Sequence, residues 1–234
     1  MKISEIPKVS IAVATYEMGG LGRKYLAELL QSVASQSYKR IEIIVSDESS
    51  DDDVVDECNL WQDRLDIAVV RQTNRISASA NFNRALVRCS GDIIKVLCQD
   101  DFLFSTKAID MTVGALSYGN SWLVSAVQIV DENRVLLGIH TPVVAKRPHL
   151  KNLIGSHSCL SFINNDQIEM FDENLLWRMD CDLFTRLLNR FGDPYILTTP
   201  SVSVRQWSGQ ATNTQVSMLM RVKEYLTMVQ RYGF

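Results

Sequence analysis

Two adjacent carboxylates follow an apolar run near the middle of the chain. The stretch VLCQDDFL places Asp100 and Asp101 directly after residues that have the pattern of a buried strand. Two like charges at one strand tip repel each other, and each gains little unless a cation bridges them. A divalent metal that carries a phosphorylated ligand would supply that cation. The alternative is a solvated turn, which would need none.

Polar side chains follow three earlier apolar runs in the same way. We expect strands at 9–15, 41–47, 67–72 and 92–99, because these runs are β-branched and bounded by polar residues, as in strands buried on both faces of a parallel sheet. Any one tip could be a capped turn. Together they predict one ligand crevice at the carboxyl ends of the strands. The residues at these tips are Thr15, Tyr16, Glu17, Asp47, Asn74, Arg75, Gln99 and Asp100.

Helical patterns separate the expected strands. The first has apolar residues at helical spacing, the second spans roughly 52–62, and the third begins at a Ser77 or Ser79 cap and ends near Cys89. Alternating strands and helices predict an open α/β sheet. In the second half, SWLVSAVQIVDENRVLLGI predicts a hairpin that turns at 131–133.

The composition limits the classes of protein. A chain of 234 residues with 46% hydrophobic and 22% charged residues can bury a full core. A net charge of -3 gives no basic footprint, so we expect no nucleic-acid partner. No apolar run reaches membrane-spanning length, and the N-terminus does not have the pattern of a signal peptide. Five cysteines without C-x-x-C spacing indicate reduced thiols, which favours a cytoplasmic protein.

Four segments, in this order and spacing, carry a family resemblance: VSIAVATYE, IEIIVSDESSDD, NRISASANFNRAL and GDIIKVLCQDDFL. They resemble the nucleotide-sugar-binding half of the family 2 glycosyltransferases, which have a GT-A fold. The resemblance implies a Rossmann-like, mainly parallel central sheet flanked by helices, with a mixed acceptor-side half. It also implies a single domain over 1–234, with a donor half at about 1–105, an acceptor and catalytic half at about 106–212, and a C-terminal helix at about 213–234.

The resemblance also implies roles for the strand-tip residues. Asp47 matches the aspartate that accepts a hydrogen bond from the nucleotide base, and Asp100 matches the aspartate that holds Mg²⁺ or Mn²⁺ against the diphosphate. Tyr16 could instead pack in the core, and Arg84 could be a solvated helix residue. The expected donor-binding residues are Thr15, Tyr16, Glu17, Asp47, Asn81, Arg84, Gln99 and Asp100.

Two positions depart from the family pattern around the metal. Cys98 stands where the family has its first aspartate, and a thiol is a poor ligand for Mg²⁺, so we expect it to be buried at the strand end. Trp207 stands where a histidine often completes the metal site, and its indole could stack on a base or a sugar. These departures leave Asp100 to hold the ion with the diphosphate and water.

A second chemical signal lies in FDENLLWRMDCDLFTRLLNRFGDPYIL. This region resembles the family segment that supplies the general base, which here is Asp180, with Met179 in place of the preceding glutamate. Apolar residues at helical spacing follow, so Asp180 should lie at or just before the first turn of a buried helix. The alternative role for Asp180 is an N-cap. A single histidine, His157, is expected to line the pocket or to be structural.

These features predict an inverting glycosyltransferase that moves a sugar from a nucleotide-diphosphate sugar to a carbohydrate or lipid-linked acceptor, in surface polysaccharide or glycoconjugate synthesis. The residues of 213–234 predict a helix that packs on the core, or that contacts a dimer partner or the inner face of the membrane. Two alternatives remain. The departures at Cys98, Met179 and Trp207 fit a non-catalytic nucleotide-sugar-binding module, and EMGGLGRKY loosely resembles the glycine-rich loop of a sugar-nucleotide pyrophosphorylase.

Overall fold

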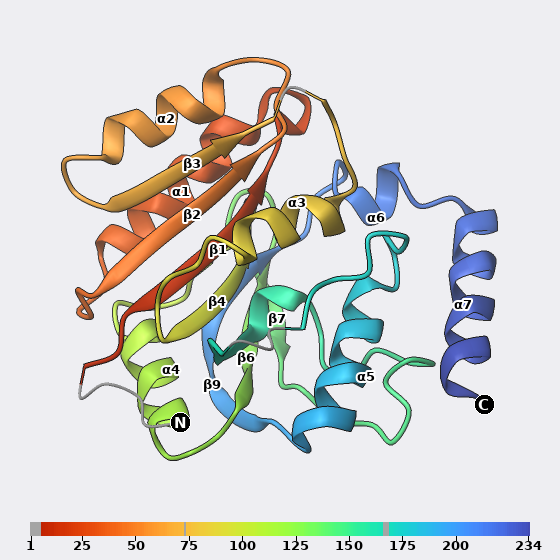
Figure 1. Cartoon of the computed structure of the whole chain (residues 1–234). Coiled ribbons are helices and arrows are strands. Elements are labelled where there is room, and N and C mark those ends of the chain that lie inside the picture. Colours follow the sequence, from red (N-terminus) through yellow and green to blue (C-terminus); the bar gives the residue numbers. More distant parts are fainter. Residues whose placement is uncertain (1–5, 73, 166–168) are drawn as a thin grey trace.

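One twisted sheet runs through the residues that the computed structural model describes, 6–72, 74–165 and 169–234 (Figure 1). Its strands follow the order β3-β2-β1-β4-β8-β6-β9-β5, and β7 pairs with β6. The bounds are β1 Val9–Thr15, β2 Ile41–Asp47, β3 Asp66–Arg71, β4 Ile93–Cys98, β5 Phe102–Leu103, β6 Trp122–Val130, β7 Leu136–His140, β8 Leu160–Ile163 and β9 Tyr195–Arg205.

The amino-terminal half of the sheet is parallel, as the sequence predicts. β1 lies between β2 and β4, and β3 pairs with β2. The register sets Thr15 beside Asp47 and Ala14 beside Cys98, so the polar strand tips meet at one edge of the sheet. The expectation of burial on both faces is wrong for β3, whose residues alternate between exposed and half-buried, because β3 is an edge strand.

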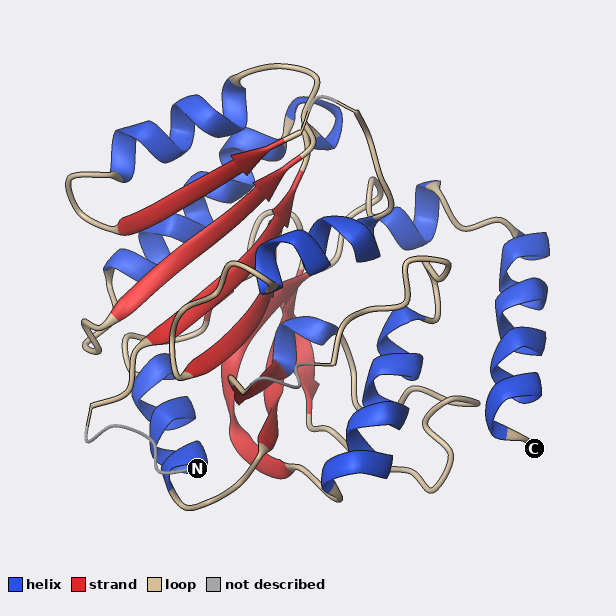
Figure 2. Ribbon diagram, viewed as in Figure 1, coloured by secondary structure: helices blue, strands red, loops and turns tan. Residues whose placement is uncertain are grey.

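Helices cover both faces of this parallel half (Figures 1 and 2). Helix α1 (Gly22–Ala34) packs beside α2 (Asp53–Trp61) on one face. Helix α3 (Ala78–Leu86) packs on β1 and β2 from the other face, and Ser77 is its N-cap because the hydroxyl accepts from the Ala80 N–H at 3.2 Å. The second and third helices therefore agree with the sequence prediction, with Ser77 as the cap.

The carboxyl-terminal half of the sheet is mixed. β8 pairs antiparallel with both β4 and β6, whereas β9 runs parallel to β6. The expected hairpin is formed by β6 and β7, and the Asp131 carboxylate fixes its turn by accepting from the N–H groups of Asn133 and Val135. The remaining elements are η1 Met18–Gly20, α4 Ala108–Ser117, η2 His157–Cys159, α5 Met179–Phe191, α6 Ala211–Thr214 and α7 Met218–Tyr232.

Helix α7 stands at the edge of the molecule (Figure 1) and is not packed on the core as a whole. Its buried residues are Glu224 and Met228, whereas Leu219, Val222 and Leu226 are 78%, 49% and 59% exposed. The predicted packing on the core holds in part, because Met228 belongs to the core and Tyr232 packs against it, whereas three residues of the predicted stripe face away from the protein. No helix within the described ranges is both long and apolar enough to cross a bilayer.

Candidate active site

A cavity of about 540 Å³ opens at the carboxyl ends of β1 and β4. Helix α3, η2, the start of α5 and helix α7 close it on the other sides, so both halves of the sheet contribute to it. The predicted site residues that line it are Tyr16, Asn81, Gln99, Asp100 and Asp180. The others, which lie outside the cavity wall, are Thr15, Glu17, Asp47 and Arg84.

Asp47 is fully buried at the tip of β2. Its Oδ1 accepts hydrogen bonds from the Thr15 hydroxyl at 2.9 Å and the Ser49 hydroxyl at 2.6 Å. Thr15, also fully buried, therefore orients Asp47 instead of facing the cavity. Asp47 Oδ2 accepts no hydrogen bond from the described residues, and its nearest cation is Arg71 Nε at 3.8 Å. This oxygen is enclosed in protein, behind the cavity wall.

Two further residues predicted to bind the donor have buried polar atoms without a partner among the described residues. Asn81 donates through Nδ2 to the Thr15 carbonyl at 3.1 Å, but its Oδ1 has no partner among the described residues. Arg84 donates to the Gln72 side chain. Its Nη1 is buried and has no hydrogen-bond partner among the described residues. Together with Asp47 Oδ2, these atoms are three buried polar groups of the predicted site that have no hydrogen-bond partner among the described residues.

Tyr16, Glu48 and Arg75 form the outer wall of the cavity. The Arg75 guanidinium lies 5.0 Å from the centre of the Tyr16 ring and forms ion pairs with Glu17 at 3.5 Å and Glu48 at 3.8 Å. Glu48 is held in place because its Oε2 accepts from the Ile76 N–H at 2.9 Å, and burial raises its pKa. The Arg75 side chain is 53% exposed, so it can contact an anionic ligand from the solvent side.

Gln99 fixes the position of neighbouring backbone. Its Oε1 accepts from the Tyr16 N–H and its Nε2 donates to the Gly22 carbonyl, both at 2.9 Å. Both ends of the amide are thereby occupied. Gln99 joins the tip of β4 to the turn after β1 and lines the cavity without a free polar group at its end.

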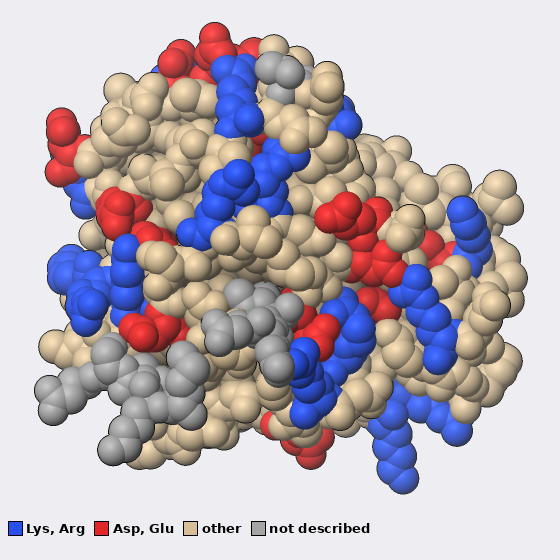
Figure 3. All heavy atoms as spheres, viewed as in Figure 1, with Lys and Arg blue, Asp and Glu red and all other residues tan. Residues whose placement is uncertain are grey.

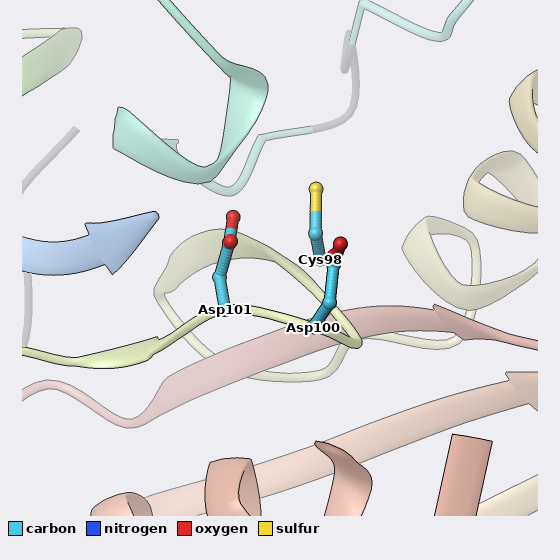
Figure 4. Close-up of side chains that lie close together, drawn as sticks. All are labelled: Cys98, Asp100 and Asp101. Atoms are coloured by element: carbon cyan, nitrogen blue, oxygen red, sulfur yellow. The ribbon is translucent and has the colours of Figure 1, made fainter. Parts of the chain in front are cut away.

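Three side chains from the tip of β4 point to one side of the loop that follows it (Figure 4). The ligand atoms of Cys98, Asp100 and Asp101 all lie within 4.8 Å of one another. Burial raises the pKa of Asp100, and burial together with the Asp100 charge raises the pKa of Asp101 to about 7. The repulsion expected at this tip is therefore present, and a bound cation would relieve it. The sequence prediction omitted Asp101 as a ligand, although its place beside Asp100 was a usable signal.

Arg205 and Trp207 support the two carboxylates from the end of β9. Trp207 Nε1 donates to Asp100 Oδ2 at 2.8 Å, and the indole packs edge-on against Tyr25. It orients a carboxylate and does not line the cavity, where a stacked base or sugar would lie. The backbone N–H of Arg205 donates to Asp101 Oδ1 at 2.9 Å, and its Nε donates to the Asp100 carbonyl at 2.9 Å.

A hydrogen-bonded chain crosses the cavity floor from β4 to α5. Cys98 Sγ lies 3.0 Å from His157 Nε2, and His157 Nδ1 lies 2.6 Å from Asp180 Oδ1. Burial favours the neutral imidazole, but Cys98 and Asp180 outweigh it and raise the pKa of His157 well above 6.5. Cys98 is the last residue of β4, as predicted, but it is half-buried and not fully buried, because it lines the cavity beside the carboxylates. A single histidine gave no signal of this contact.

Asp180 lies in the first turn of α5 and is not its N-cap. The N-cap is Arg178, and no side chain caps this helix end. The N-cap alternative was therefore wrong. The approach to α5 is instead fixed by Glu224 of α7, whose carboxylate accepts from the N–H groups of Leu176, Trp177 and Arg178 at 2.7 to 3.0 Å. Nothing in the sequence pattern indicated this role for Glu224.

The open sheet, the crevice at its strand tips and the mixed second half define a GT-A type fold. Among solved structures, the chain is similar to TarS of S. aureus in complex with UDP-GlcNAc (TM-score 0.67, 16% identity, 96% of this chain and 73% of that one). It is also similar to the mannosyltransferase PcManGT of Pyrobaculum calidifontis in complex with GDP-Man and Mn²⁺ (TM-score 0.65, 18% identity, 99% of this chain and 66% of that one).

The model of glycosyl transferase family 2 matches residues 10–159, and the chain belongs to this family. It is 33% identical over 103 residues to the GalNAc(5)-diNAcBac-PP-undecaprenol beta-1,3-glucosyltransferase of Campylobacter jejuni. The aligned residues cover 43% of this chain and 32% of that protein. It is 35% identical over 99 residues to the UDP-Glc:alpha-D-GlcNAc-diphosphoundecaprenol beta-1,3-glucosyltransferase of Escherichia coli, covering 42% and 38%. The matched segments span about a third of these relatives. An uncharacterized glycosyltransferase of Rickettsia typhi is 26% identical over 91% of this chain and 68% of its own length.

Proposed function

We propose that the chain is an inverting glycosyltransferase that uses a nucleotide-diphosphate sugar and that Asp180 is its general base. The observation that carries this proposal is the single cavity shared by Asp180 and the carboxylate cluster of β4. Asp180 takes the proton of an acceptor hydroxyl while the hydroxyl oxygen attacks the anomeric carbon. The bond from that carbon to the diphosphate breaks, and the diphosphate leaves with the electron pair. One displacement inverts the anomeric centre.

His157 positions the base. A carboxylate only accepts hydrogen bonds, so His157 Nδ1 donates to Asp180 Oδ1, which leaves the second carboxylate oxygen for the proton of the acceptor. The hydrogen bond limits the rotation of the Asp180 side chain, and the first turn of α5 fixes its backbone. A general base needs such a fixed geometry before its pKa matters.

The donor would bind along the tips of β1, β2 and β4. Asp47 Oδ2 accepts from an N–H of the base, Tyr16 offers an aromatic face, and Asn81 and Arg75 face the diphosphate and sugar. Arg84 lies behind the cavity wall and would act through Gln72, to which it donates, and Glu17 holds Arg75 from outside the cavity. Thr15 contributes by orienting the Asp47 side chain, and Gln99 contributes by fixing the backbone at Tyr16 and Gly22.

Mn²⁺ or Mg²⁺ would be held by Asp100 at the tip of β4. The donor set fits a divalent cation, because two buried carboxylates lie together and raise each other's cost of ionisation. A cation there would neutralise the charge that develops on the departing diphosphate. Trp207 and Arg205 hold the carboxylates in place for it.

The acceptor we propose is a lipid-linked saccharide, and α7 would bring the cavity to the membrane surface. The two named relatives act on undecaprenol diphosphate-linked sugars according to their names. Helix α7 lines the cavity with Met220 and Glu224 while it exposes its apolar stripe to solvent. Lys and Arg side chains lie over and below α7 on the face shown in Figure 3, which suits an anionic lipid surface. Such a protein would work in the cytoplasm, peripheral to the inner face of the membrane.

The two alternatives differ in the support they receive. Family membership argues against a sugar-nucleotide pyrophosphorylase. A non-catalytic binding module would keep the donor contacts but would not need Asp180 beside His157. The placement of Asp180 in the cavity therefore favours the enzyme.

Replacement of Asp180 by Asn tests the proposal. Asn retains the oxygen that accepts from His157 Nδ1, so we expect an unchanged melting temperature and unchanged binding of UDP or GDP by calorimetry. Sugar transfer from labelled UDP- or GDP-sugars to a membrane lipid extract should fall by roughly a hundred- to ten-thousand-fold, because the general base is lost. Asp193→Asn, at an exposed carboxylate just after α5, is the matched control and should retain transfer. Full transfer by Asp180→Asn would refute the proposal.

A further inference from the structure

The candidate metal site contains a thiol. Cys98 Sγ lies with the Asp100 and Asp101 oxygens in one cluster, and all three residues line the cavity. Figure 4 shows the three side chains on the same side of the loop after β4. A thiol among carboxylates is an unusual donor set for Mg²⁺, which prefers oxygen ligands, whereas sulfur ligands favour softer ions.

The surroundings fix the thiol in this position. The Ser158 hydroxyl accepts from the Cys98 N–H at 2.9 Å and also hydrogen-bonds the Asp101 side chain, so one residue of η2 holds two members of the cluster. Trp207 orients Asp100, and Arg205 orients Asp101. Outer hydrogen bonds of this kind orient metal ligands in proteins. Both carboxylates are more than nine-tenths buried, which argues against an adventitious surface cluster.

His157 holds the thiol from the other side. Its Nε2 lies 3.0 Å from Cys98 Sγ, and its Nδ1 lies 2.6 Å from Asp180 Oδ1. These two contacts keep the Cys98 side chain beside the Asp100 and Asp101 carboxylates. A thiol that binds a metal ion does so as the thiolate.

We propose that Cys98 is a ligand of the bound ion and that this site consequently prefers a thiophilic divalent cation, such as Zn²⁺ or Co²⁺, to Mg²⁺. The inference rests on the proposed function, since it assumes that the ion binds in the donor cavity with a nucleoside diphosphate. The sequence analysis expected no metal bond from Cys98. Under this proposal, its thiolate takes the place of the aspartate that the family has at this position. The ligands are Cys98, Asp100 and Asp101, with the diphosphate and water in the other positions.

Cobalt absorption tests the thiolate bond without an assay of activity. Co²⁺ is added to the metal-free chain, alone and with UDP or GDP, and the near-ultraviolet band of a cobalt–thiolate bond is recorded. We expect the band in the wild type, its loss in Cys98→Ser, and its retention in Cys89→Ser, which removes a half-buried thiol in the segment after α3. Melting curves of the variants show that they are folded. Absence of the band in the wild type, or its persistence in Cys98→Ser, would overturn the inference.

A second variant should shift the ion preference in the opposite direction, toward Mg²⁺, and calorimetry measures this shift. Cys98→Asp replaces the thiol by a hard oxygen ligand, so its affinity for Mg²⁺ in the presence of UDP or GDP should rise at least about tenfold while its preference for Zn²⁺ falls. An unchanged Mg²⁺ to Zn²⁺ ratio would contradict the role of Cys98. If UDP and GDP bind with Mg²⁺ and no cobalt–thiolate band forms, the inference fails and the proposed function stands. If neither nucleotide binds with any ion, the proposed function fails as well.

Discussion

At the scale of single residues, the site combines side chains that line the cavity with side chains that hold their neighbours. Asp180, Asp100 and Asp101 line the cavity, whereas Thr15, Gln99 and Trp207 orient their neighbours. Apart from Asp180, which begins α5, the residues of both groups lie at or just after strand ends, so the sequence pattern treats them alike. The difference lies in the hydrogen bonds, since an orienting residue has used its polar atoms within the protein.

Replacement of Asp47 by Asn tests recognition of the base. The amide keeps an oxygen for the bonds from Thr15 and Ser49 but presents NH₂ where Oδ2 would accept, so nucleotide affinity should weaken by roughly 1.5 to 3 kcal/mol, the range for hydrogen bonds to charged groups. Calorimetry with UDP, GDP and dTDP measures it. Asp56→Asn, at an exposed carboxylate of α2, should bind as the wild type does. Equal affinity of Asp47→Asn and the wild type would mean that Asp47 only fixes the turn.

At the scale of elements, α7 connects a surface to the cavity. Its buried carboxylate, Glu224, holds the backbone that leads into α5, and the opposite side of the helix carries the exposed stripe. A helix with such a stripe needs a partner, because exposed apolar area of this kind is costly in water. The membrane contact proposed above would bury this stripe.

The double variant Leu219→Asp/Leu226→Asp tests contact with lipid. Burial of a leucine side chain contributes about 1.5 to 3 kcal/mol, so the variant should bind vesicles of phosphatidylglycerol and phosphatidylethanolamine at least tenfold more weakly. Cosedimentation measures this. Leu60→Asp is the control, because Leu60 is 67% exposed on α2, another helix. Undiminished vesicle binding by the double variant would contradict contact with lipid. If light scattering finds a dimer for the wild type and a monomer for the double variant, the stripe binds a second copy of the protein instead.

At the scale of the whole molecule, the end of the sheet opposite the cavity contributes stability. Glu42 is 7% exposed and accepts from Lys8 Nζ at 2.5 Å and from the Ser90 and Gly91 N–H groups at 2.6 and 3.1 Å, which joins β2 to the start of β1 and the turn before β4. Burial opposes its ionisation, but the hydrogen bonds from Lys8, Ser10 and Ser90 outweigh burial and lower its pKa from 4.5 to about 2.

The pH dependence of unfolding follows from this shift. A carboxylate with a lowered pKa stabilises the fold fully above its unfolded value of 4.5, and the contribution is lost as the pH falls from there to about 2. Glu42→Gln should therefore cost on the order of 2 kcal/mol at neutral pH and flatten the acid limb of the stability curve. Urea denaturation at several pH values measures both effects. Asp63→Asn, at an exposed carboxylate, should retain the wild-type acid limb; an equal acid limb in Glu42→Gln would contradict the prediction.

The sequence by itself determined the parallel half of the fold and the place of the site. Apolar runs that end in polar residues specify buried strands and their tips, because burial and local turn chemistry act over a few residues, and they placed Asp100 at such a tip, whereas the family resemblance pointed to Asp180; both residues line the cavity. Only the tertiary structure decided the rest. The bond from Cys98 through His157 to Asp180 joins residues far apart in the chain, as does the support of α5 by Glu224. Such contacts depend on the packing of separate elements, which no local pattern encodes. The exposure of the α7 stripe was hidden for the same reason, since an apolar helical face looks alike in sequence whether it packs inward or outward.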